Sequence, residues 1–151
     1  MSGPNAQLQT SDAGIALIKR FESFCATVYR CPAGKPTIGY GHVILPGEQF
    51  GTITEADAIE LLRQDLAIAE AAVRRLITVP LTQSQFDALV SFTFNVGEGA
   101  LEKSTLRRRI NQREWPKAAS ELRRWVHSDG KVLPGLVTRR DEEVALLLRN
   151  T

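Results

Sequence analysis

Three polar side chains near the start of the chain have types and a spacing that could carry out a hydrolysis. Glu22, Cys31 and Thr37 form the pattern E-x8-C-x5-T. A carboxylic acid can protonate a leaving oxygen, while a thiol or a hydroxyl can position water or attack as a nucleophile. By itself, Glu22 is also compatible with an exposed acid at the end of a helix. Its neighbours Phe21 and Phe24 are apolar and a glycine-containing turn follows, which favours a carboxyl group that faces a ligand.

The elements that must position these side chains are an amphipathic helix and a short hairpin. Apolar residues at helical spacing after a candidate N-cap, Ser11, predict a helix over about 12–23. β-prone residues then predict strands at 27–29 and 37–40, divided by a turn rich in proline and glycine at 32–36. The helix therefore ends beside the hairpin, with Glu22 at the junction.

Helices are predicted over most of the remaining chain. A third short strand is expected near 42–45, and a long helix then begins after the N-cap Thr54, with Asp57 as its capping partner, and ends before Pro80. Further helices are expected at about 82–96, where Thr82 and Gln85 form a capping box, and at 103–111, 115–126 and 136–149, with a loop at 127–135. This order predicts an α+β fold: a small sheet lobe, a long connecting helix and an all-helical lobe, with a cleft between the lobes.

Length and composition indicate a globular chain. We expect residues 1–151, of which 43% are hydrophobic, to form a single domain in which residues 1–10 are a polar N-terminal extension. The sequence contains neither an apolar run of the roughly 18 residues that a membrane helix needs nor the apolar region of a signal peptide. We therefore expect a protein that is made and kept in the cytoplasm, with Cys25 and Cys31 as free thiols and no zinc site.

Charge is distributed unevenly along the chain. Residues 1–99 contain 7 basic and 10 acidic side chains, a net charge of −3, whereas residues 100–151 contain 12 basic and 7 acidic ones, a net charge of +5. A basic half is typical of proteins that meet a polyanion, and equally of a solvated helical surface. This basic half contains three runs of adjacent arginines, Arg107–Arg109, Arg123–Arg124 and Arg139–Arg140, which could face a polyanion or solvent. No nucleic-acid-binding signature accompanies them, so we expect no nucleic-acid partner.

Several motifs together resemble those of the phage-type lysozymes. E-x8-C-x5-T leads into "TIGYGH" (37–42), which resembles the catalytic signature of that family. "ITEADAIELLRQDL" (53–66) is similar to its inter-lobe helix, "QFDALVSFTFNVGEGAL" (85–101) to its helix and turn at the cleft, and "SELRRWV" (120–126) and "GLVTRRDEE" (135–143) to its C-terminal segments. The resemblance extends over about residues 11–149. It implies a lysozyme-like fold and hydrolysis of the β-1,4 bond between N-acetylmuramic acid and N-acetylglucosamine, without metal or cofactor.

The resemblance also implies roles for the three residues of the pattern. Glu22 would be the general acid, and Thr37 would help to hold the attacking water. Cys31 departs from the aspartate that is commoner in the family, and an unperturbed thiol, with a pKa of about 8.5, is mostly neutral at pH 7. Nearby Arg30 and Lys35 could favour the thiolate. Cys31 could orient water, trap the glycosyl cation as a nucleophile or be merely structural, so the resemblance leaves inversion or retention open.

Other positions are carried over from the family in the same way. His42 could be a second acid/base group or a metal ligand, but the family pattern indicates a structural pair between His42 and Asp65. For substrate binding the resemblance implies Gly41 and Val43 on the sheet side of the cleft, and Phe94, Asn95 and Thr105 on the other side. Phe94 could instead be a core residue and Asn95 a helix cap.

These comparisons of motifs predict an endolysin. Its partner would be the glycan strands of peptidoglycan, and we expect a monomer that does not insert into a membrane and has no separate wall-binding domain. With neither signal peptide nor anchor, it would stay in the host cytoplasm until it is released to the cell wall at lysis. The alternatives are a peptidoglycan-binding protein that uses the lysozyme fold without turnover and, from the basic half, a helical nucleic-acid-binding protein.

Overall fold

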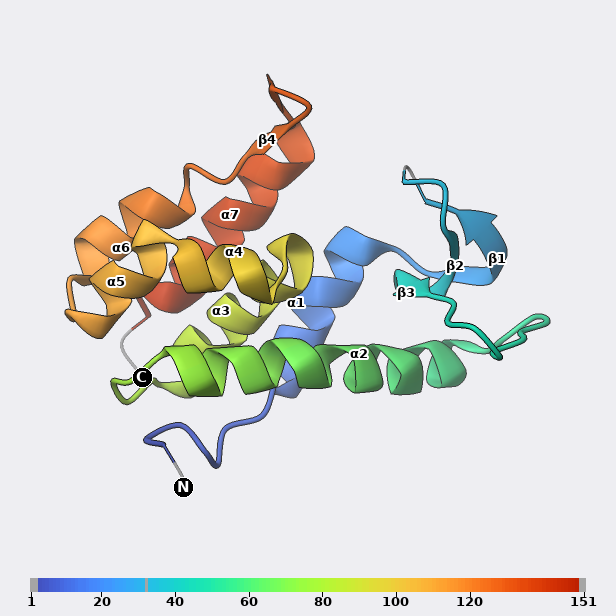
Figure 1. The fold of residues 1–151 in the computed structure, drawn as a ribbon, viewed down its shortest axis with the longest axis horizontal. Helices are drawn as coiled ribbons and strands as arrows, with labels where there is room; N and C mark the ends of the chain where they lie inside the picture. Colours follow the sequence, from blue (N-terminus) through green and yellow to red (C-terminus); the bar gives the residue numbers. More distant parts are fainter. Residues whose placement is uncertain (1–2, 32, 150–151) are drawn as a thin grey trace.

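The computed structural model describes residues 3–31 and 33–149, so Pro32 in the expected turn and the two ends of the predicted domain lie outside the described residues. It contains helices and short strands in an α+β arrangement (Figure 1). In chain order they are α1 (Asp12–Glu22), β1 (Cys25–Arg30), β2 (Pro36–Gly39), β3 (His42–Val43), α2 (Glu55–Leu76), α3 (Gln83–Val96), α4 (Glu98–Lys103), α5 (Thr105–Asn111), α6 (Trp115–Leu122), β4 (His127–Ser128), β5 (Lys131–Val132) and α7 (Pro134–Leu147).

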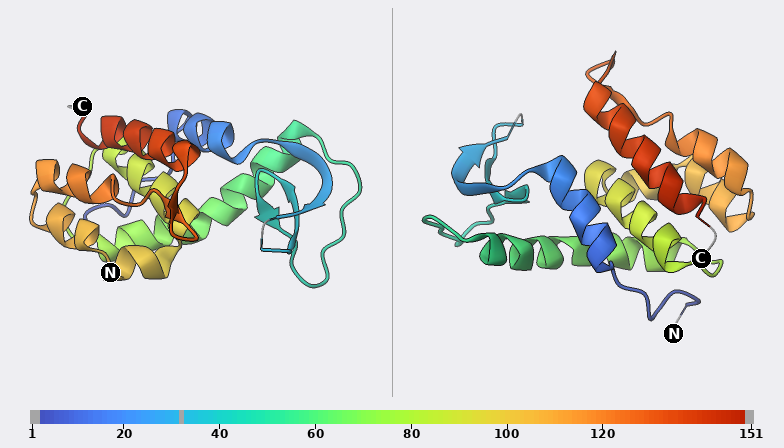
Figure 2. Two further views of the ribbon diagram at one scale, coloured as in Figure 1. Left: turned by 90° about the horizontal axis from the view of Figure 1, so that it is seen from above. Right: turned by 180° about the vertical axis from the view of Figure 1, so that it is seen from behind.

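Helix α2 joins two lobes, as the sequence predicts. Figures 1 and 2 show β1, β2, β3 and the loop after them at one end of α2, and helices α3 to α7 over its other end. The helix has 22 residues, which gives it a length of about 33 Å at 1.5 Å per residue. Thr54 and Asp57 form its predicted capping box. One face is buried, and its apolar residues include Ala58, Leu62, Leu66, Ala69, Val73 and Leu76.

The small sheet is antiparallel with the order β1-β2-β3. Thr37 at its centre lies opposite Tyr29 of β1 and Val43 of β3, and the register shifts between Cys25 and Tyr29. The strand β1 is longer than predicted and β3 is shorter. The central strand is the most buried, so Thr37 and Ile38 are almost inaccessible to solvent.

The helical lobe is built around α3, which lies against α1, α2 and α7. Its capping box, Thr82 with Gln85, is the predicted one, and Gly97 is its C-cap with a φ of 96°. The helix predicted at about 103–111 is α5, while α4 before it was not predicted; Ser104 ends α4 and caps α5 by accepting the N–H of Arg107. The predicted loop at 127–135 contains the two-stranded hairpin of β4 and β5.

The N-terminal extension packs against the helical lobe over its described residues. Asn5 is 1% exposed, its amide nitrogen donates to the carbonyl of Val79 at 2.9 Å, and its oxygen accepts the N–H of Leu81 at 2.8 Å. Thr10 donates both its N–H and its hydroxyl to Glu70. The polar residues of this segment therefore form hydrogen bonds that attach it to α2 and to the connection after it. Among the described residues, no helix is both long and apolar enough to cross a membrane.

Candidate active site

Glu22 is the last residue of α1 and lies between the lobes. Ser11 caps the start of the helix, and Ser23, with a φ of 60°, ends it. The carboxylate Oε2 accepts a hydrogen bond of 2.7 Å from Nη1 of Arg139 on α7, and the side chain is 21% exposed. One oxygen is thus held by the helical lobe while the group keeps access to solvent.

Gly41 brings the backbone of the sheet lobe against the same carboxylate. An added Cβ at this position would lie 3.0 Å from Oε1 of Glu22, and the residue has a φ of 80°. Both the positive φ and the close approach favour glycine. The two oxygens of Glu22 therefore face different lobes, with Oε1 toward Gly41 and Oε2 toward Arg139.

Behind Glu22 lies a buried chain of alternating charges. Arg139 and Arg140 flank Glu143, with hydrogen bonds of 3.3 and 2.6 Å to its two oxygens, and the three side chains are between 0% and 4% exposed. Ser91 of α3 donates its hydroxyl to Glu143 at 2.6 Å, and its carbonyl accepts from Arg139. We call Glu143, Arg139 and Arg140 the α7 network. The surface placement expected for Arg139–Arg140 is wrong, because each guanidinium donates a hydrogen bond to Glu143 inside the lobe.

The α7 network reaches the cleft a second time through Asn95. Arg140 donates to the side-chain oxygen of Asn95 and, at 2.8 Å, to the carbonyl of Trp125. Burial lowers the pKa of Arg140, and the charge of Glu143 works against that shift. Asn95 is inside α3 and does not cap it, since the C-cap is Gly97. Its amide is therefore oriented by the same network that holds Glu22.

A cleft of about 420 Å³ contains most of the predicted site residues. It is lined by Glu22, Gly41, His42, Val43, Leu45, Asp65, Ile68, Phe94 and Asn95. Phe94 is partly buried against the core and also lines the cleft, so its substrate contact stays a prediction. Leu45 and Ile68 are absent from the sequence-based predictions. Thr105 does not line this cleft; it is the first residue of α5, and its hydroxyl accepts from Arg108.

Cys31 and Thr37 lie together on the sheet lobe, outside the residues that line this cleft. The N–H of Lys35, with smaller contributions from the N–H of Ala33 and the hydroxyl of Thr37, lowers the pKa of the Cys31 thiol. The thiolate is favoured as expected, although by hydrogen bonds rather than by the side-chain charges of Arg30 and Lys35. Thr37 is 2% exposed and its hydroxyl donates to the carbonyl of Lys35 at 3.0 Å.

Tyr29 connects the two groups of predicted residues. It lies across from Thr37 in the sheet, and its pKa is raised by burial and then by the charges of Cys25, Glu22 and Cys31. The charges of both Glu22 and Cys31 thus act on the pKa of the Tyr29 phenol. No sequence motif singled out Tyr29. Its place at the end of the predicted strand 27–29, two residues before Cys31, was the signal available.

His42 forms the predicted pair with Asp65 and has a further partner. Its Nδ1 lies 2.8 Å from Asp65, and its Nε2 lies 3.0 Å from Glu48. Burial opposes charge on the ring, but the hydrogen bonds to Glu48 and Asp65 outweigh it and raise the pKa of His42. Burial also raises the pKa of Asp65, while the N–H of Leu45 and then His42 lower that of Glu48. We call His42, Asp65 and Glu48 the His42 network.

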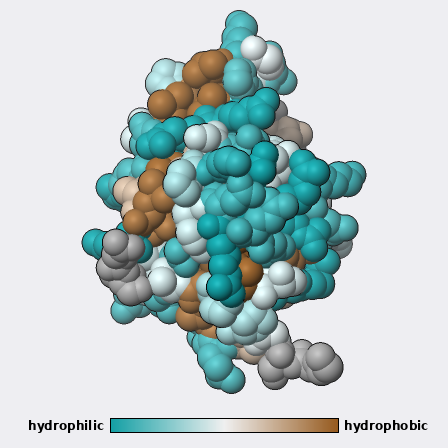
Figure 3. All heavy atoms as spheres, turned by 90° about the vertical axis from the view of Figure 1, so that its left-hand side faces the viewer, coloured by the Kyte–Doolittle hydropathy of each residue, from teal (hydrophilic) through white to brown (hydrophobic). Residues whose placement is uncertain are grey.

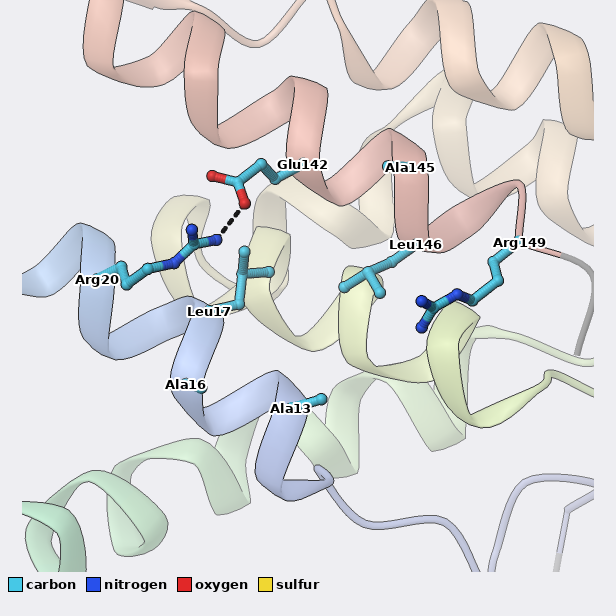
Figure 4. A pocket seen from close by; sticks show the side chains of 8 residues that line it. All are labelled: Ala13, Ala16, Leu17, Arg20, Glu142, Ala145, Leu146 and Arg149. Atoms are coloured by element: carbon cyan, nitrogen blue, oxygen red, sulfur yellow. Dashed lines mark hydrogen bonds and ion pairs between the residues drawn. The ribbon is translucent and has the colours of Figure 1, made fainter.

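A second hollow, of about 400 Å³, lies between α1 and α7 and contains none of the predicted site residues. Figure 4 shows Arg20 of α1 and Glu142 of α7 pointing toward one another across it, where they form an ion pair. The remaining lining is mostly alanine and leucine. With no group suited to proton transfer other than this ion pair among its described lining residues, the hollow is a poor candidate for an active site.

Two further features bear on the expected chemistry. Within residues 3–31 and 33–149, no three His, Cys, Asp or Glu side chains are grouped so that they could hold a metal ion. Figure 3 looks onto the end of the helical lobe and shows a mostly hydrophilic surface. Several of the basic side chains of this lobe pair with nearby acids, as Arg123 does with Asp141 and Arg124 with Glu121, which fits a solvated surface.

Comparisons with known sequences and structures agree with this arrangement. A family sequence model described as phage lysozyme matches residues 19–143. The chain is 46% identical over 143 residues to an endolysin of Bacillus phage B103, covering 93% of this chain and 54% of that protein. It is 39% identical over 145 residues to an endolysin of Salmonella phage P22, covering 93% of this chain and 99% of that protein. The chain thus spans about half the length of some curated relatives and nearly all of others.

Solved structures show the same fold. The muramidase domain of SpmX from Asticaccaulis excentricus superposes with a TM-score of 0.87 at 39% identity, covering 95% of this chain and all of that one (100%). An endolysin from an Escherichia coli phage, FAHEc1, gives a TM-score of 0.87 at 35% identity, covering 98% and 96% of the two chains. The predicted lysozyme-like α+β fold is confirmed, and the chain belongs to the phage lysozyme family.

Proposed function

We propose that this chain is a muramidase of the endolysin type, which hydrolyses the β-1,4 bond between N-acetylmuramic acid and N-acetylglucosamine in peptidoglycan. The observation that carries the proposal is the carboxyl group of Glu22. It lies in a cleft between two lobes, with one oxygen held by Arg139 and the other against Gly41. Family membership supports the same class of reaction.

In the proposed mechanism Glu22 is the general acid. Its proton passes to the glycosidic oxygen as the bond to the anomeric carbon breaks and the sugar becomes oxocarbenium-like. Arg139 fixes the orientation of the carboxyl group through Oε2. A water molecule then adds to the anomeric carbon, and its proton leaves to a base or to solvent.

Cys31 and Thr37 are proposed to place that water. Hydrogen bonds from the backbone lower the pKa of the Cys31 thiol, which supports a role for its sulfur in accepting a hydrogen bond from water, in place of the carboxylate of other family members. The same lowered pKa would suit a nucleophile, so the anomer formed first distinguishes the two roles. Gly41, Val43, Phe94 and Asn95 are proposed to contact the glycan. For Thr105, a contact with the glycan is supported by the family pattern alone.

We further propose that the chain acts as a monomer on glycan strands and reaches the cell wall when the host lyses. The similarity of the chain to phage endolysins supports this course of events. Neither nucleic acid nor membrane insertion is part of the proposal, and His42 with Asp65 is assigned to stability rather than to chemistry.

The test is identification of the products released from purified peptidoglycan. We expect muropeptides with N-acetylmuramic acid at the reducing end, detected by mass spectrometry after borohydride reduction. N-acetylglucosamine at the reducing end would overturn the bond specificity. Binding to peptidoglycan without any release would favour the non-catalytic alternative. Following the first anomer by NMR in the same digestion decides between inversion through water and retention through Cys31.

A further inference from the structure

Side chains from three parts of the chain meet where α1 approaches the sheet lobe. Tyr40 lies in the turn between β2 and β3, and its hydroxyl donates to Oε2 of Glu55, the first residue of α2, at 2.5 Å. Nζ of Lys19 on α1 lies 3.3 Å from the same oxygen and 5.5 Å from the centre of the Tyr40 ring. We call Lys19, Tyr40 and Glu55 the Tyr40 network. One carboxylate oxygen thus joins α1, the β2–β3 turn and α2.

The protonation states within the Tyr40 network are complementary. Burial, followed by the hydrogen bond to Glu55, raises the pKa of Tyr40 to about 12, and the hydrogen bonds from Tyr40 and then Lys19 lower the pKa of Glu55. At neutral pH a phenol therefore donates to a carboxylate that also pairs with an ammonium group. Tyr40 is 4% exposed, and its ring lies 5.6 Å from that of Phe24, centre to centre. Packing and the hydrogen bond together fix the position of the Tyr40 ring.

Two members of the network are close in sequence to the two groups that meet at the acid. Tyr40 immediately precedes Gly41, whose backbone lies against Oε1 of Glu22. Lys19 precedes Glu22 by three residues on α1, so the two side chains lie on the same face of the helix. The network therefore connects the helix that ends in the acid with the backbone that the acid faces.

The distance between Glu22 and the sheet lobe matters for the proposed chemistry. Cys31 and Thr37, which are proposed to place the water, lie on that lobe, whereas Arg139 holds Glu22 from the helical lobe. The helix α1 itself packs against α3. A misplacement of about 1 Å between reacting groups can lower a rate by about 10². Contacts that tie the last turns of α1 to the sheet lobe should therefore affect the rate.

We infer that Lys19, Tyr40 and Glu55 are positioning residues for Glu22, which set its distance from the groups of the sheet lobe. None of the three is among the residues that line the cleft, so substrate binding should not depend on them directly. The inference rests on the proposed function, because it takes Glu22 as the general acid. Loss of the network should lower kcat and leave KM nearly unchanged.

Y40F is the first test, because it removes only the hydroxyl and keeps the ring against Phe24 and Lys19. We expect kcat on purified peptidoglycan to fall about tenfold, with KM within about twofold of wild type. The matched control is T82A, which removes the capping hydroxyl of α3 outside the cleft and should lower Tm with kcat unchanged. A wild-type kcat in Y40F, or equal falls in both variants, would overturn the inference.

A double-mutant cycle tests whether Tyr40 and Glu55 act as one unit. E55A should lower kcat as Y40F does, and Y40F/E55A should be no slower than E55A, because the same contact is lost in each. E55Q keeps an oxygen that can accept from Tyr40 and should retain most of the activity. Losses that multiply in the double variant would mean that the two residues act independently, and the inference would be wrong.

NMR gives a readout that needs no turnover and so separates the inference from the proposed function. The ¹³C signal of the Glu22 carboxyl carbon should move in Y40F and stay in place in T82A. An unmoved signal in Y40F would overturn the inference. If the signal moves but the wild-type chain releases no muropeptides from peptidoglycan, the proposed function fails while the link between the Tyr40 network and Glu22 stands.

Discussion

The two sides of the cleft each contain an ionic network, and the two differ in burial and in the kind of cation. The α7 network uses guanidinium groups that stay charged at any ordinary pH, and its members are at most 4% exposed. The His42 network uses an imidazole, and its carboxylates Asp65 and Glu48 are 27% and 31% exposed. The first touches Glu22 directly, whereas the second ties β3 and a turn to α2.

This difference separates two uses of charge in one small fold. An acid that must remain oriented is attached to a network whose cations stay charged over the ordinary pH range. The sheet lobe is held to α2 by His42, and histidine is the side chain whose ordinary pKa lies closest to neutrality. Function should therefore be most sensitive to the α7 side, and pH-dependent stability should arise on the His42 side.

The largest effect is expected from E143Q. The substitution leaves Arg140 buried without an anionic partner and leaves Arg139 with Glu22 alone, which should cost about 3–5 kcal/mol in the free energy of unfolding. Urea denaturation at pH 7 measures it. The matched control is E142Q, on the same helix, where Glu142 is 36% exposed and pairs with Arg20 at the surface; about 1 kcal/mol or less is expected. Equal losses in both variants would remove the distinction between the networks.

Cys31 tests the chemistry of the sheet side. C31A should lower the rate of peptidoglycan hydrolysis by about 10² or more, because only the Thr37 hydroxyl remains to hold the water, while C31D should stay active. A C25S background excludes effects of the other thiol. An active C31A would demote the residue to a structural role. If both variants are inactive and a glycosyl adduct is trapped on wild-type Cys31, the thiol is the nucleophile.

H42N should weaken the fold rather than the chemistry. Loss of hydrogen bonds to two carboxylates should lower the free energy of unfolding by about 2 kcal/mol, with activity per folded molecule retained. Since the folded pKa of His42 is raised, its contribution is complete below the unfolded pKa of about 6.5 and disappears as pH rises through the folded value. The stability difference between wild type and H42N, measured across this range, should therefore shrink with increasing pH.

The smallest effect is expected from E48Q. Asp65 still holds His42, so Tm should fall by no more than about 3 °C. The pKa of His42, followed by NMR titration of its ring protons, should move down toward its ordinary value because one of the two carboxylates is gone. An unchanged pKa would show that Glu48 does not contact the ring in solution.

Local patterns made much of the architecture predictable. Capping boxes at Thr54 and Thr82 and the apolar periodicity that follows each of them define α2 and α3, because both signals act within a few residues. The hairpin of β4 and β5 was missed because two-residue strands have too few residues for an alternating pattern. The break at Ser104 depends on one side-chain cap inside a helix-forming sequence.

The site was predictable where a short motif contains the residues, and not where distant segments meet. Glu22 and Gly41 belong to one sequence pattern, and the structure brings them together. Arg139 is 117 positions from Glu22 in the chain, and only the packing of α7 shows that it is buried beside the acid. From the sequence, Glu48 is only an acid in a loop, and the fold shows that it lies beside His42.

Activity of E22Q on purified peptidoglycan tests the central claim most directly. The amide of the substituted side chain would keep an oxygen for Arg139 but has no acidic proton to give, so the fold should persist with an unfolding midpoint near that of wild type. We predict a fall in the rate of reducing-end formation on the order of 10²–10⁴. A folded E22Q that hydrolyses peptidoglycan at close to the wild-type rate would contradict the assignment of Glu22 as the general acid.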